Sequence, residues 1–165
     1  MRPLTYALPL LSALAAIAAP SPNLEARQVQ PNQHGTIISP SADSLVSSGG
    51  TFDFNYRQSN WCNAGYSPIT VWLTDYEPVA ANLTTTGVFP EGAYTFFFGS
   101  FLEPNFGLPP LSGNPPPPST LTLPTVDGVV SGGKLYLAVV ETANTCPPRN
   151  VPPQYALTKT SLVLQ

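Results

Sequence analysis

The sequence predicts an all-β protein, built as a two-sheet sandwich of about seven strands. Three observations predict this class. Apolar residues recur at every second position in several short runs, which is the pattern of strands with one buried face. Glycine and proline, 12 and 21 of the 165 residues, separate these runs. No long stretch shows the apolar spacing of an amphipathic helix, and seven short strands in this length favour a sandwich over a barrel.

The expected strands follow one another at short intervals. They are 36–39, 51–57, 69–74, 93–102, 121–123, 135–139 and 155–164. The clearest alternation runs from Phe52 to Tyr56, so we expect one face of this strand in the core and the other in water. The continuous apolarity of 93–102 predicts a strand that is covered on both faces. In the last strand the alternation slips between Leu157 and Leu162, as a bulge would cause.

The first residues predict export. Arg2, an apolar stretch and a run of small residues predict a secretory signal peptide over 1–18. The segment 19–27 ends in a site that resembles those cut by secretory processing proteases, although the usual Lys-Arg pair is missing, and we expect it to be a propeptide. Residues 28–165 have the usual size of a single β-sandwich domain.

Charge and hydropathy exclude two classes of partner. After the predicted propeptide the chain holds four basic and eight acidic residues. Its basic residues Arg57, Lys134, Arg149 and Lys159 are scattered singly, whereas nucleic-acid binding needs a cluster. After the signal, no apolar run approaches the roughly eighteen residues of a spanning helix, and the C-terminal residues lack a lipid-anchor signal. We therefore expect no membrane anchor and a secreted protein, extracellular or associated with a cell wall.

The two cysteines predict a disulfide, because Cys62 and Cys146 lie in a chain expected in an oxidising compartment. With a single histidine, His34, they cannot complete a zinc site, and we expect no metal or cofactor. In an immunoglobulin-like or fibronectin III-like order, the second and sixth strands end at the same pole. Cys62 follows the second expected strand and Cys146 the sixth, so a bridge fits that topology. Closing a loop of about 85 residues would contribute roughly 4 to 5 kcal/mol.

The connection 104–118 is rich in proline, and its last part should be extended polyproline II. Two interpretations remain open for it. It is either a docking site for an aromatic groove on another protein, or a stiff crossover that loses little entropy on folding. We favour the crossover.

The runs 37–40, 49–56 and 71–73 (IISP, GGTFDFNY and VWL) are similar to the pattern of small secreted β-sandwich proteins of basidiomycete fungi. This likeness extends over most of the chain after the propeptide, including 146–148 (CPP). More distantly, the first third resembles the immunoglobulin-like N-terminal module of Kre9/Knh1-type cell-wall proteins, which opens with I-x-x-P, a glycine turn and an alternating strand. The second resemblance implies a location in or near the fungal wall. Neither implies a known chemistry.

Candidate catalytic residues are few. Asp75 and Glu77 are the nearest pair of carboxylates, and glycoside hydrolysis needs such a pair, but beside Pro78 they fit a solvated turn. His34 precedes a glycine, as in copper-dependent polysaccharide monooxygenases, yet the chain has no second histidine to share the metal. No nucleophile elbow of the G-x-S-x-G type occurs. We expect a protein that is not an enzyme.

Asn82 begins the triplet Asn-Leu-Thr, an N-glycosylation acceptor, which predicts a glycan on a surface loop. The rarer cysteine form of the acceptor occurs at Asn60 and Asn144, but Cys62 and Cys146 are expected in the bridge. A glycan would add solubility to a chain with only 9% charged residues.

The end of the sandwich that holds the disulfide is the candidate binding surface. There Trp61, Asn63 and Tyr66 from one loop should approach Asn144 and Arg149 from the other. Aromatic rings beside amides and a guanidinium suit either a sugar ring or a protein surface. The alternative is that Trp61 simply covers the disulfide.

These observations lead to a hypothesis of a secreted, non-catalytic binding protein of the fungal cell surface or its surroundings. Its expected partner is wall polysaccharide or an extracellular protein. An effector-like protein that binds a host or microbial protein is the alternative, followed by a hydrolase of an unfamiliar kind. The polysaccharide interpretation predicts that Trp61→Ala or Tyr66→Ala abolishes retention on insoluble glucan or chitin and leaves the fold intact.

Overall fold

A computed structural model of the protein describes residues 34–126, 128–144, 146 and 152–165. The regular structure in these residues is all β apart from one short 3-10 turn, η2 (Ala80–Asn82). The strands are β1 (Thr36–Ser39), β2 (Ser44–Val46), β3 (Thr51–Asp53), β4 (Asn55–Arg57), β5 (Tyr66–Thr74), β6 (Phe96–Pro104), β7 (Thr120–Thr122), β8 (Lys134–Ala143) and β9 (Gln154–Leu164). The predicted all-β class is confirmed. The predicted signal peptide, 1–18, and propeptide, 19–27, lie outside the described residues.

The described residues hold nine strands where about seven were expected. One additional strand is β2, which has three residues and only one buried side chain, Val46, so it leaves little alternation in the sequence. The other arises because the predicted strand 51–57 is divided at Phe54. On one side of Phe54 the chain pairs with β7, and on the other side it pairs with β1, so one run of alternating residues serves two partners.

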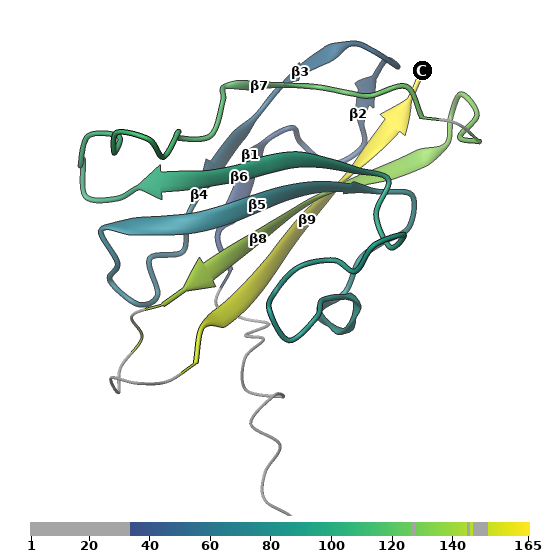
Figure 1. The fold of residues 1–165 in the computed structure, drawn as a ribbon. Helices are drawn as coiled ribbons and strands as arrows, with labels where there is room; N and C mark the ends of the chain where they lie inside the picture. Colours follow the sequence, from purple (N-terminus) through teal and green to yellow (C-terminus); the bar gives the residue numbers. More distant parts are fainter. Residues whose placement is uncertain (1–33, 127, 145, 147–151) are drawn as a thin grey trace, which may run out of the picture.

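Five strands form the main sheet, in the order β2-β9-β8-β5-β6 (Figure 1). All neighbours in this sheet are antiparallel except β2 and β9, which run parallel. The strand β6 lies at one edge of the sheet, and β9, β8 and β5 are its interior strands. Two smaller antiparallel pairs, β1-β4 and β3-β7, form a second layer. This arrangement of layers is consistent with a β-sandwich.

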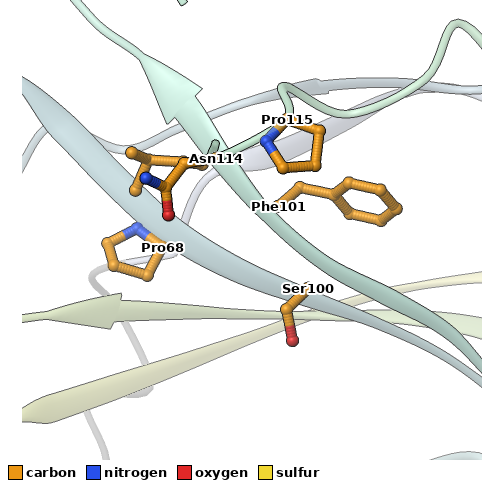
Figure 2. A pocket seen from close by; sticks show the side chains of 6 residues that line it. Pro68, Ser100, Phe101, Asn114 and Pro115 are labelled. Carbon is orange, nitrogen blue, oxygen red and sulfur yellow. The ribbon is translucent and has the colours of Figure 1, made fainter. Parts of the chain in front are cut away.

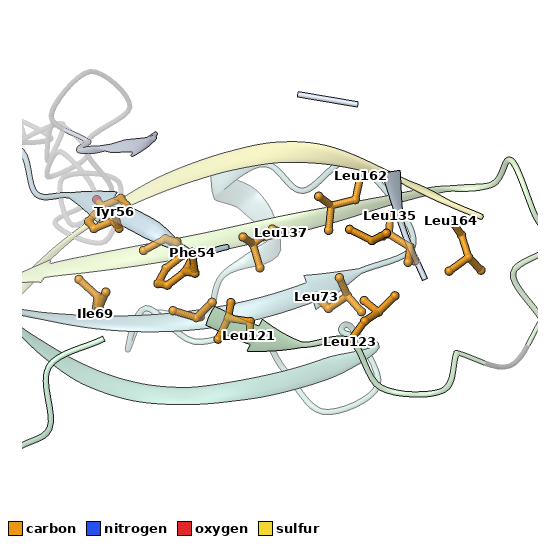
Figure 3. Close-up of a cluster of buried hydrophobic side chains, with 13 residues drawn as sticks. Phe54, Tyr56, Ile69, Leu73, Leu121, Leu123, Leu135, Leu137, Leu162 and Leu164 are labelled. Carbon is orange, nitrogen blue, oxygen red and sulfur yellow. The ribbon is translucent and has the colours of Figure 1, made fainter. Parts of the chain in front are cut away.

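The main core lies between the two layers (Figure 3). In β5 and β8 every second residue points into it, as the period of a strand requires. The buried side chains of this cluster are Val46, Phe54, Tyr56, Ile69, Val71, Leu73, Leu121, Leu123, Leu135, Leu137, Val139, Leu162 and Leu164. Each large apolar side chain that is fully buried stabilises the fold by about 1.5 to 3 kcal/mol relative to an exposed one.

The opposite face of the main sheet is also covered, by a second apolar cluster around Trp72. The cover comes from the long connection between β5 and β6. The ring of Trp72 lies 5.6 Å from that of Phe89 and 4.8 Å from that of Tyr94, both in this connection, and 4.2 Å from that of Phe97 on β6. The main sheet is therefore apolar on both faces in its centre.

Two expectations about individual strands are wrong. The pairing of β8 with β9 is continuous and shows no bulge between Leu157 and Leu162. The apparent slip arises because Leu157 packs against the cluster around Trp72 while Leu162 points into the main core, on the other face. The aromatic run was expected to be covered on both faces, but β6 is an edge strand in which Phe96 and Phe97 are 39% and 38% exposed.

Candidate binding site

The disulfide predicted from the sequence is present. Cys62, in the connection from β4 to β5, is bonded to Cys146, which follows β8. Both cysteines are buried and form a small cluster with Ala143. The bridge therefore ties together two loops at one end of the sandwich, which we call the disulfide end.

Trp61 packs against the disulfide cluster and is only partly exposed. Its indole Nε1 is buried and donates no hydrogen bond within the described part of the chain. The side-chain oxygen of the neighbouring Asn60 is likewise buried without a donor. The structure thus supports the interpretation that Trp61 covers the disulfide, and the ring is less accessible to a ligand than the sugar-stacking interpretation requires.

The other residues predicted for this end are brought together only in part. Asn63 and Asn144 are exposed, and Asn63 closes a turn by donating its backbone N–H to the carbonyl oxygen of Asn60 at 3.2 Å. Arg149 lies outside the described residues. Tyr66 begins β5, and its hydroxyl donates to the backbone oxygen of Pro109 at 2.9 Å. That hydroxyl therefore holds the proline-rich connection in place.

The connection from β6 to β7 is fastened to the start of β5 by further hydrogen bonds. The backbone N–H of Asn105 donates to the oxygen of Gly65 at 2.9 Å, and its side-chain Nδ2 donates to the oxygen of Ala64 at 3.1 Å. The backbone N–H of Leu108 closes a tight turn on the oxygen of Asn105 at 2.9 Å. We call residues 105–111 the apolar loop. It lies at the disulfide end, because β5 begins there and β6 ends there (Figure 1).

The apolar loop presents large side chains to solvent. Phe106 is 64% exposed, and Leu108 and Leu111 are exposed as well. Phe106 also has a backbone φ of 53°, in the left-handed region that asparagine and glycine favour and a bulky residue seldom adopts. Its prolines favoured a stiff crossover, and these exposed residues were not predicted. The available signal was the presence of two large apolar residues, Phe106 and Leu108, in the four residues that separate Pro104 from Pro109.

Next to this loop, a hollow of about 220 Å³ lies between the strands β5 and β6 and the proline-rich connection (Figure 2). Its walls are mostly apolar, with one amide and one hydroxyl. The lining residues are Pro68, Ser100, Phe101, Leu102, Asn114 and Pro115. In Figure 2 the ring of Pro115 lies beside that of Phe101, and Asn114 faces Pro68. Such a mixture of flat apolar surfaces and a few polar groups is typical of small binding sites.

A carboxylate is buried between the layers at the disulfide end. Glu141 on β8 is 1% exposed, and its oxygens accept hydrogen bonds from the hydroxyl of Tyr56 at 2.8 Å, the backbone N–H of Ser59 at 3.1 Å and the hydroxyl of Ser59 at 2.9 Å. Burial, followed by the negative charge of Glu141, raises the pKa of Tyr56 above its usual range. The hydroxyl of Ser67 donates to the side-chain oxygen of Gln58 nearby. Because both oxygens of Glu141 accept hydrogen bonds, this network links β8 of the main sheet to Tyr56 and Ser59 on the side of the second layer.

Glu103 on β6 is a second carboxylate in this region. It lines a hollow of about 230 Å³ together with Phe54, Asn55, Tyr56, Pro117, Pro118 and Ser119. Its partial burial, and then the negative charge of Glu141, raise the pKa of Glu103.

Of the residues considered for catalysis, Asp75 and Glu77 follow the other end of β5, whereas His34 precedes Gly35, whose backbone N–H donates to the hydroxyl of Tyr56 at 3.1 Å. Glu77 forms an ion pair with Lys159 at 2.8 Å, and the hydrogen bond to Lys159 lowers the pKa of Glu77. Asp75 is exposed, and Nδ1 of His34 lies 2.9 Å from the backbone oxygen of Gly35. Within the described ranges, no three His, Cys, Asp or Glu side chains gather as a metal site would require. In the same part of the chain, no helix is long and apolar enough to cross a membrane.

The predicted glycosylation residue, Asn82, ends the turn η2 and is partly exposed. Its side-chain oxygen accepts a hydrogen bond from the backbone N–H of Val79 at 2.7 Å. This bond uses the oxygen of the amide, whereas a glycan is attached to the nitrogen. The structure therefore leaves the attachment of a glycan as a prediction.

Comparison with known proteins identifies no family. No protein-family model matches the chain, and no curated protein matches it significantly. The resemblances to fungal secreted and cell-wall proteins therefore stay predictions. The function has to be inferred from the surfaces described above.

Proposed function

We propose that this chain is a secreted, non-catalytic binding protein with an immunoglobulin-like fold. It acts at the fungal cell surface or in its surroundings by binding another extracellular protein through the apolar loop. The disulfide and the all-β architecture are compatible with an extracellular protein. The residues at the disulfide end support a binding role better than a catalytic one, because the buried carboxylates there serve structural hydrogen bonds.

The order of the strands supports the immunoglobulin-like part of the proposal. In such folds, strands named A, B and E form one layer, and G, F, C and C′ form the other. The pairs β1-β4 and β3-β7 correspond to the first layer, because β3 and β4 are halves of one strand, and β9-β8-β5-β6 correspond to the second. The parallel strand β2 would be a continuation of the first strand that has crossed to the other layer. Loops at the ends of these sandwiches are a common place for binding residues.

The observation that carries the proposal is the conformation and exposure of Phe106. A bulky residue held in the left-handed region costs of order 1 to 3 kcal/mol, and the 64% exposed ring of Phe106 contributes little burial to offset this cost. Backbone strain of this kind is concentrated at functional sites. The hydrogen bonds from Asn105 and Tyr66 hold the loop in one shape, so a partner would not have to order it on binding.

The chemistry of the loop favours a protein partner over a polysaccharide. Its exposed side chains, Phe106, Leu108 and Leu111, are purely apolar. Phenylalanine is enriched at the centre of protein interfaces. A sugar site also needs groups that hydrogen-bond hydroxyls, and the two aromatic residues predicted for that role, Trp61 and Tyr66, are engaged with the disulfide cluster and with Pro109.

The test compares capture of extracellular proteins by the secreted chain and by two variants. Phe106→Asn removes the ring but suits the left-handed turn. Val130→Ser is the matched control, because Val130 is an apolar residue that is 76% exposed elsewhere on the surface. We expect one reproducible protein, identified by mass spectrometry, to be captured by the wild type and by Val130→Ser and to be lost with Phe106→Asn. Equal capture by all three chains, or equal loss in both variants, would contradict the proposal.

Wall polysaccharide is the second candidate partner, and the hollow in Figure 2 is the observation that favours it. The rings of Phe101 and Pro115 offer flat apolar surfaces, and the amide of Asn114 and the hydroxyl of Ser100 can bond to sugar hydroxyls. The test is retention on insoluble β-glucan, chitin or cellulose, with albumin as the control for nonspecific adsorption. Retention that falls with Asn114→Ala but not with Phe106→Asn would assign the polysaccharide to the hollow.

A further inference from the structure

We infer that the hollow of about 230 Å³ beside Glu103 is a binding site for a guanidinium group, such as that of an arginine side chain. We call it the Glu103 hollow. It shares no lining residue with the hollow of Figure 2. The chemistry of the Glu103 hollow does not depend on the proposed function, but an arginine on a partner protein as the source of the group rests on it.

The Glu103 hollow lies between the two layers, at the edge strand β6. Glu103 is near the end of β6 and pairs with Ser67 on β5. Ser67 is buried and stands two positions before Ile69, which points into the main core, so both face the second layer. Paired residues share a face of the sheet, and Glu103 therefore faces that layer too. The opposite wall is formed by the start of β4 and by residues 117–119.

Hydrogen bonds hold both walls of the hollow in place. On the side of the second layer, the backbone N–H of Phe54 donates to the oxygen of Ser119 at 2.8 Å. On the side of β6, the backbone N–H of Leu102, next to Glu103, donates to the oxygen of Pro115 at 3.0 Å. A ligand therefore meets a site whose backbone is already fixed, and binding costs little chain entropy.

The groups around the hollow are mainly hydrogen-bond acceptors. An ionised Glu103 can only accept, and the prolines 117–118 contribute backbone oxygens without an N–H. The N–H of Phe54 and the hydroxyl of Tyr56 are donors, but both are already bonded to acceptors of the protein. The two remaining lining residues have an amide and a hydroxyl, which can accept as well as donate. A guanidinium complements such a lining, because it carries a positive charge, several N–H donors and no acceptor.

Glu103 has no counter-ion in the described part of the chain. Its carboxylate forms no hydrogen bond or ion pair there, and the two lysines of the chain pair with other carboxylates. Arg57 on β4 is exposed and lies on the opposite face of its strand from the buried Tyr56. A charge that is partly withdrawn from water without a partner is unfavourable, and a bound cation would offset this cost.

The test is an NMR titration of the nitrogen-15-labelled protein with N-acetyl-arginine methylamide, whose guanidinium is its only charge. The matched probe is the corresponding citrulline compound, which has nearly the same shape and no charge. The titration is run at about pH 8, well above the usual pKa range of carboxylates. We expect saturable shifts of the amides of Glu103 and Ser119 with the arginine probe, with a Kd on the order of millimolar, and none with the citrulline probe.

Two variants and one further signal separate binding from a structural role. Glu103→Gln keeps the shape of the side chain and should raise Kd by at least about 10-fold. Glu91→Gln makes the same change in net charge at an exposed position and should leave Kd unchanged. The arginine probe should also lower the pKa of Glu103, because a nearby cation favours the charged form. Glu141 and Tyr56, the titratable groups that face it from β8 and β4, are followed in the same pH series.

An inward-pointing charge can also serve only to protect the edge of a sheet, and such a carboxylate would bind neither probe. Absence of binding, equal binding of both probes, or equal binding by Glu103→Gln and Glu91→Gln would overturn the inference. None of these results would alter the loss of protein capture expected for Phe106→Asn, so the two proposals fail separately. Weaker capture of the partner protein by Glu103→Gln would place the arginine on that partner, and unchanged capture would assign the site to a free guanidinium compound.

Discussion

The hydroxyl of Tyr56 on β4 donates a hydrogen bond to Oε2 of Glu141 on β8 at 2.8 Å, and this bond joins the two layers of the sandwich near the disulfide. Tyr56 is 4% exposed and Glu141 is 1% exposed. The same tyrosine oxygen accepts the backbone N–H of Gly35 at 3.1 Å, and Ser59 completes the shell around the carboxylate. A buried carboxylate is tolerated when such donors satisfy it.

We expect Glu141→Ala to destabilise the fold strongly. It leaves the hydroxyl of Tyr56 and both donors of Ser59 without an acceptor in a buried region. Each unsatisfied buried group costs about 1 to 3 kcal/mol, so the free energy of unfolding should fall by about 3 kcal/mol or more. Urea denaturation followed by fluorescence measures this free energy of unfolding. Glu91→Ala is the control, because Glu91 is exposed and its loss should change stability by less than about 0.5 kcal/mol.

The raised pKa of Glu103 predicts an unusual dependence of stability on pH. Its folded pKa lies above the value of 4.5 that applies when the chain is unfolded, so the folded state holds the proton more tightly. The stability that this proton contributes is fully present below pH 4.5 and is lost as the pH rises through the folded pKa. Glu103→Gln should therefore remove a decline in stability that begins as the pH rises above 4.5 and continues through the folded pKa of Glu103.

Urea midpoints measured at several pH values check this prediction. Glu77→Gln is the control, because the ion pair with Lys159 lowers the pKa of Glu77 and its contribution is lost only as the pH falls below 4.5. Above that pH the two variants should therefore differ from the wild type in opposite directions, with Glu103→Gln more stable and Glu77→Gln less stable. Parallel curves for the wild type and Glu103→Gln above pH 4.5 would show that Glu103 is not perturbed.

The position of Trp61 predicts an effect on stability before any effect on binding. Trp61→Ala removes a ring that packs against the disulfide cluster, and we expect a loss of about 2 to 4 kcal/mol. Trp61→Phe keeps most of the packing and removes a buried N–H without a partner, so it should cost less than about 1 kcal/mol. Thermal and urea unfolding of both variants provide the comparison. If Trp61→Ala unfolds at the same urea concentration and temperature as the wild type, the ring is not needed for the fold and is again a candidate contact for a ligand.

Features that depend on neighbours in sequence were predictable. The alternation in β5 and β8 predicted their core faces correctly, and the presence of two cysteines in a chain expected to be exported predicted the disulfide. The sequence carries no comparable sign for pairing partners. Continuous apolarity in β6 suggested burial, yet its residues lie at a sheet edge, and the apparent slip in β9 reflects two apolar faces. The layer that covers Trp72 comes from an irregular connection without any periodicity.

The candidate site was harder to predict than the fold. Trp61 and Tyr66 were chosen because aromatic residues near a disulfide suit a ligand, but their contacts show that the fold uses them. In the sequence Glu141 is a charged residue within an apolar strand, and only the structure shows that its carboxylate bonds to Tyr56 of β4 and to Ser59. The left-handed conformation of Phe106 is equally invisible, because phenylalanine has no preference for it.

That conformation gives the last prediction, in which stability and binding change in opposite directions. Phe106→Asn places a residue that favours the left-handed region where a bulky one is strained, and it removes an exposed ring that the fold does not need. We expect the free energy of unfolding to rise by about 0.5 to 1 kcal/mol in urea denaturation, while capture of the partner protein is lost. Phe106→Leu keeps an apolar side chain and the strain, so its stability should stay within about 0.5 kcal/mol of the wild type. If Phe106→Asn instead lowers the free energy of unfolding, the ring stabilises the fold, and the conformation of Phe106 no longer supports a binding site in the loop.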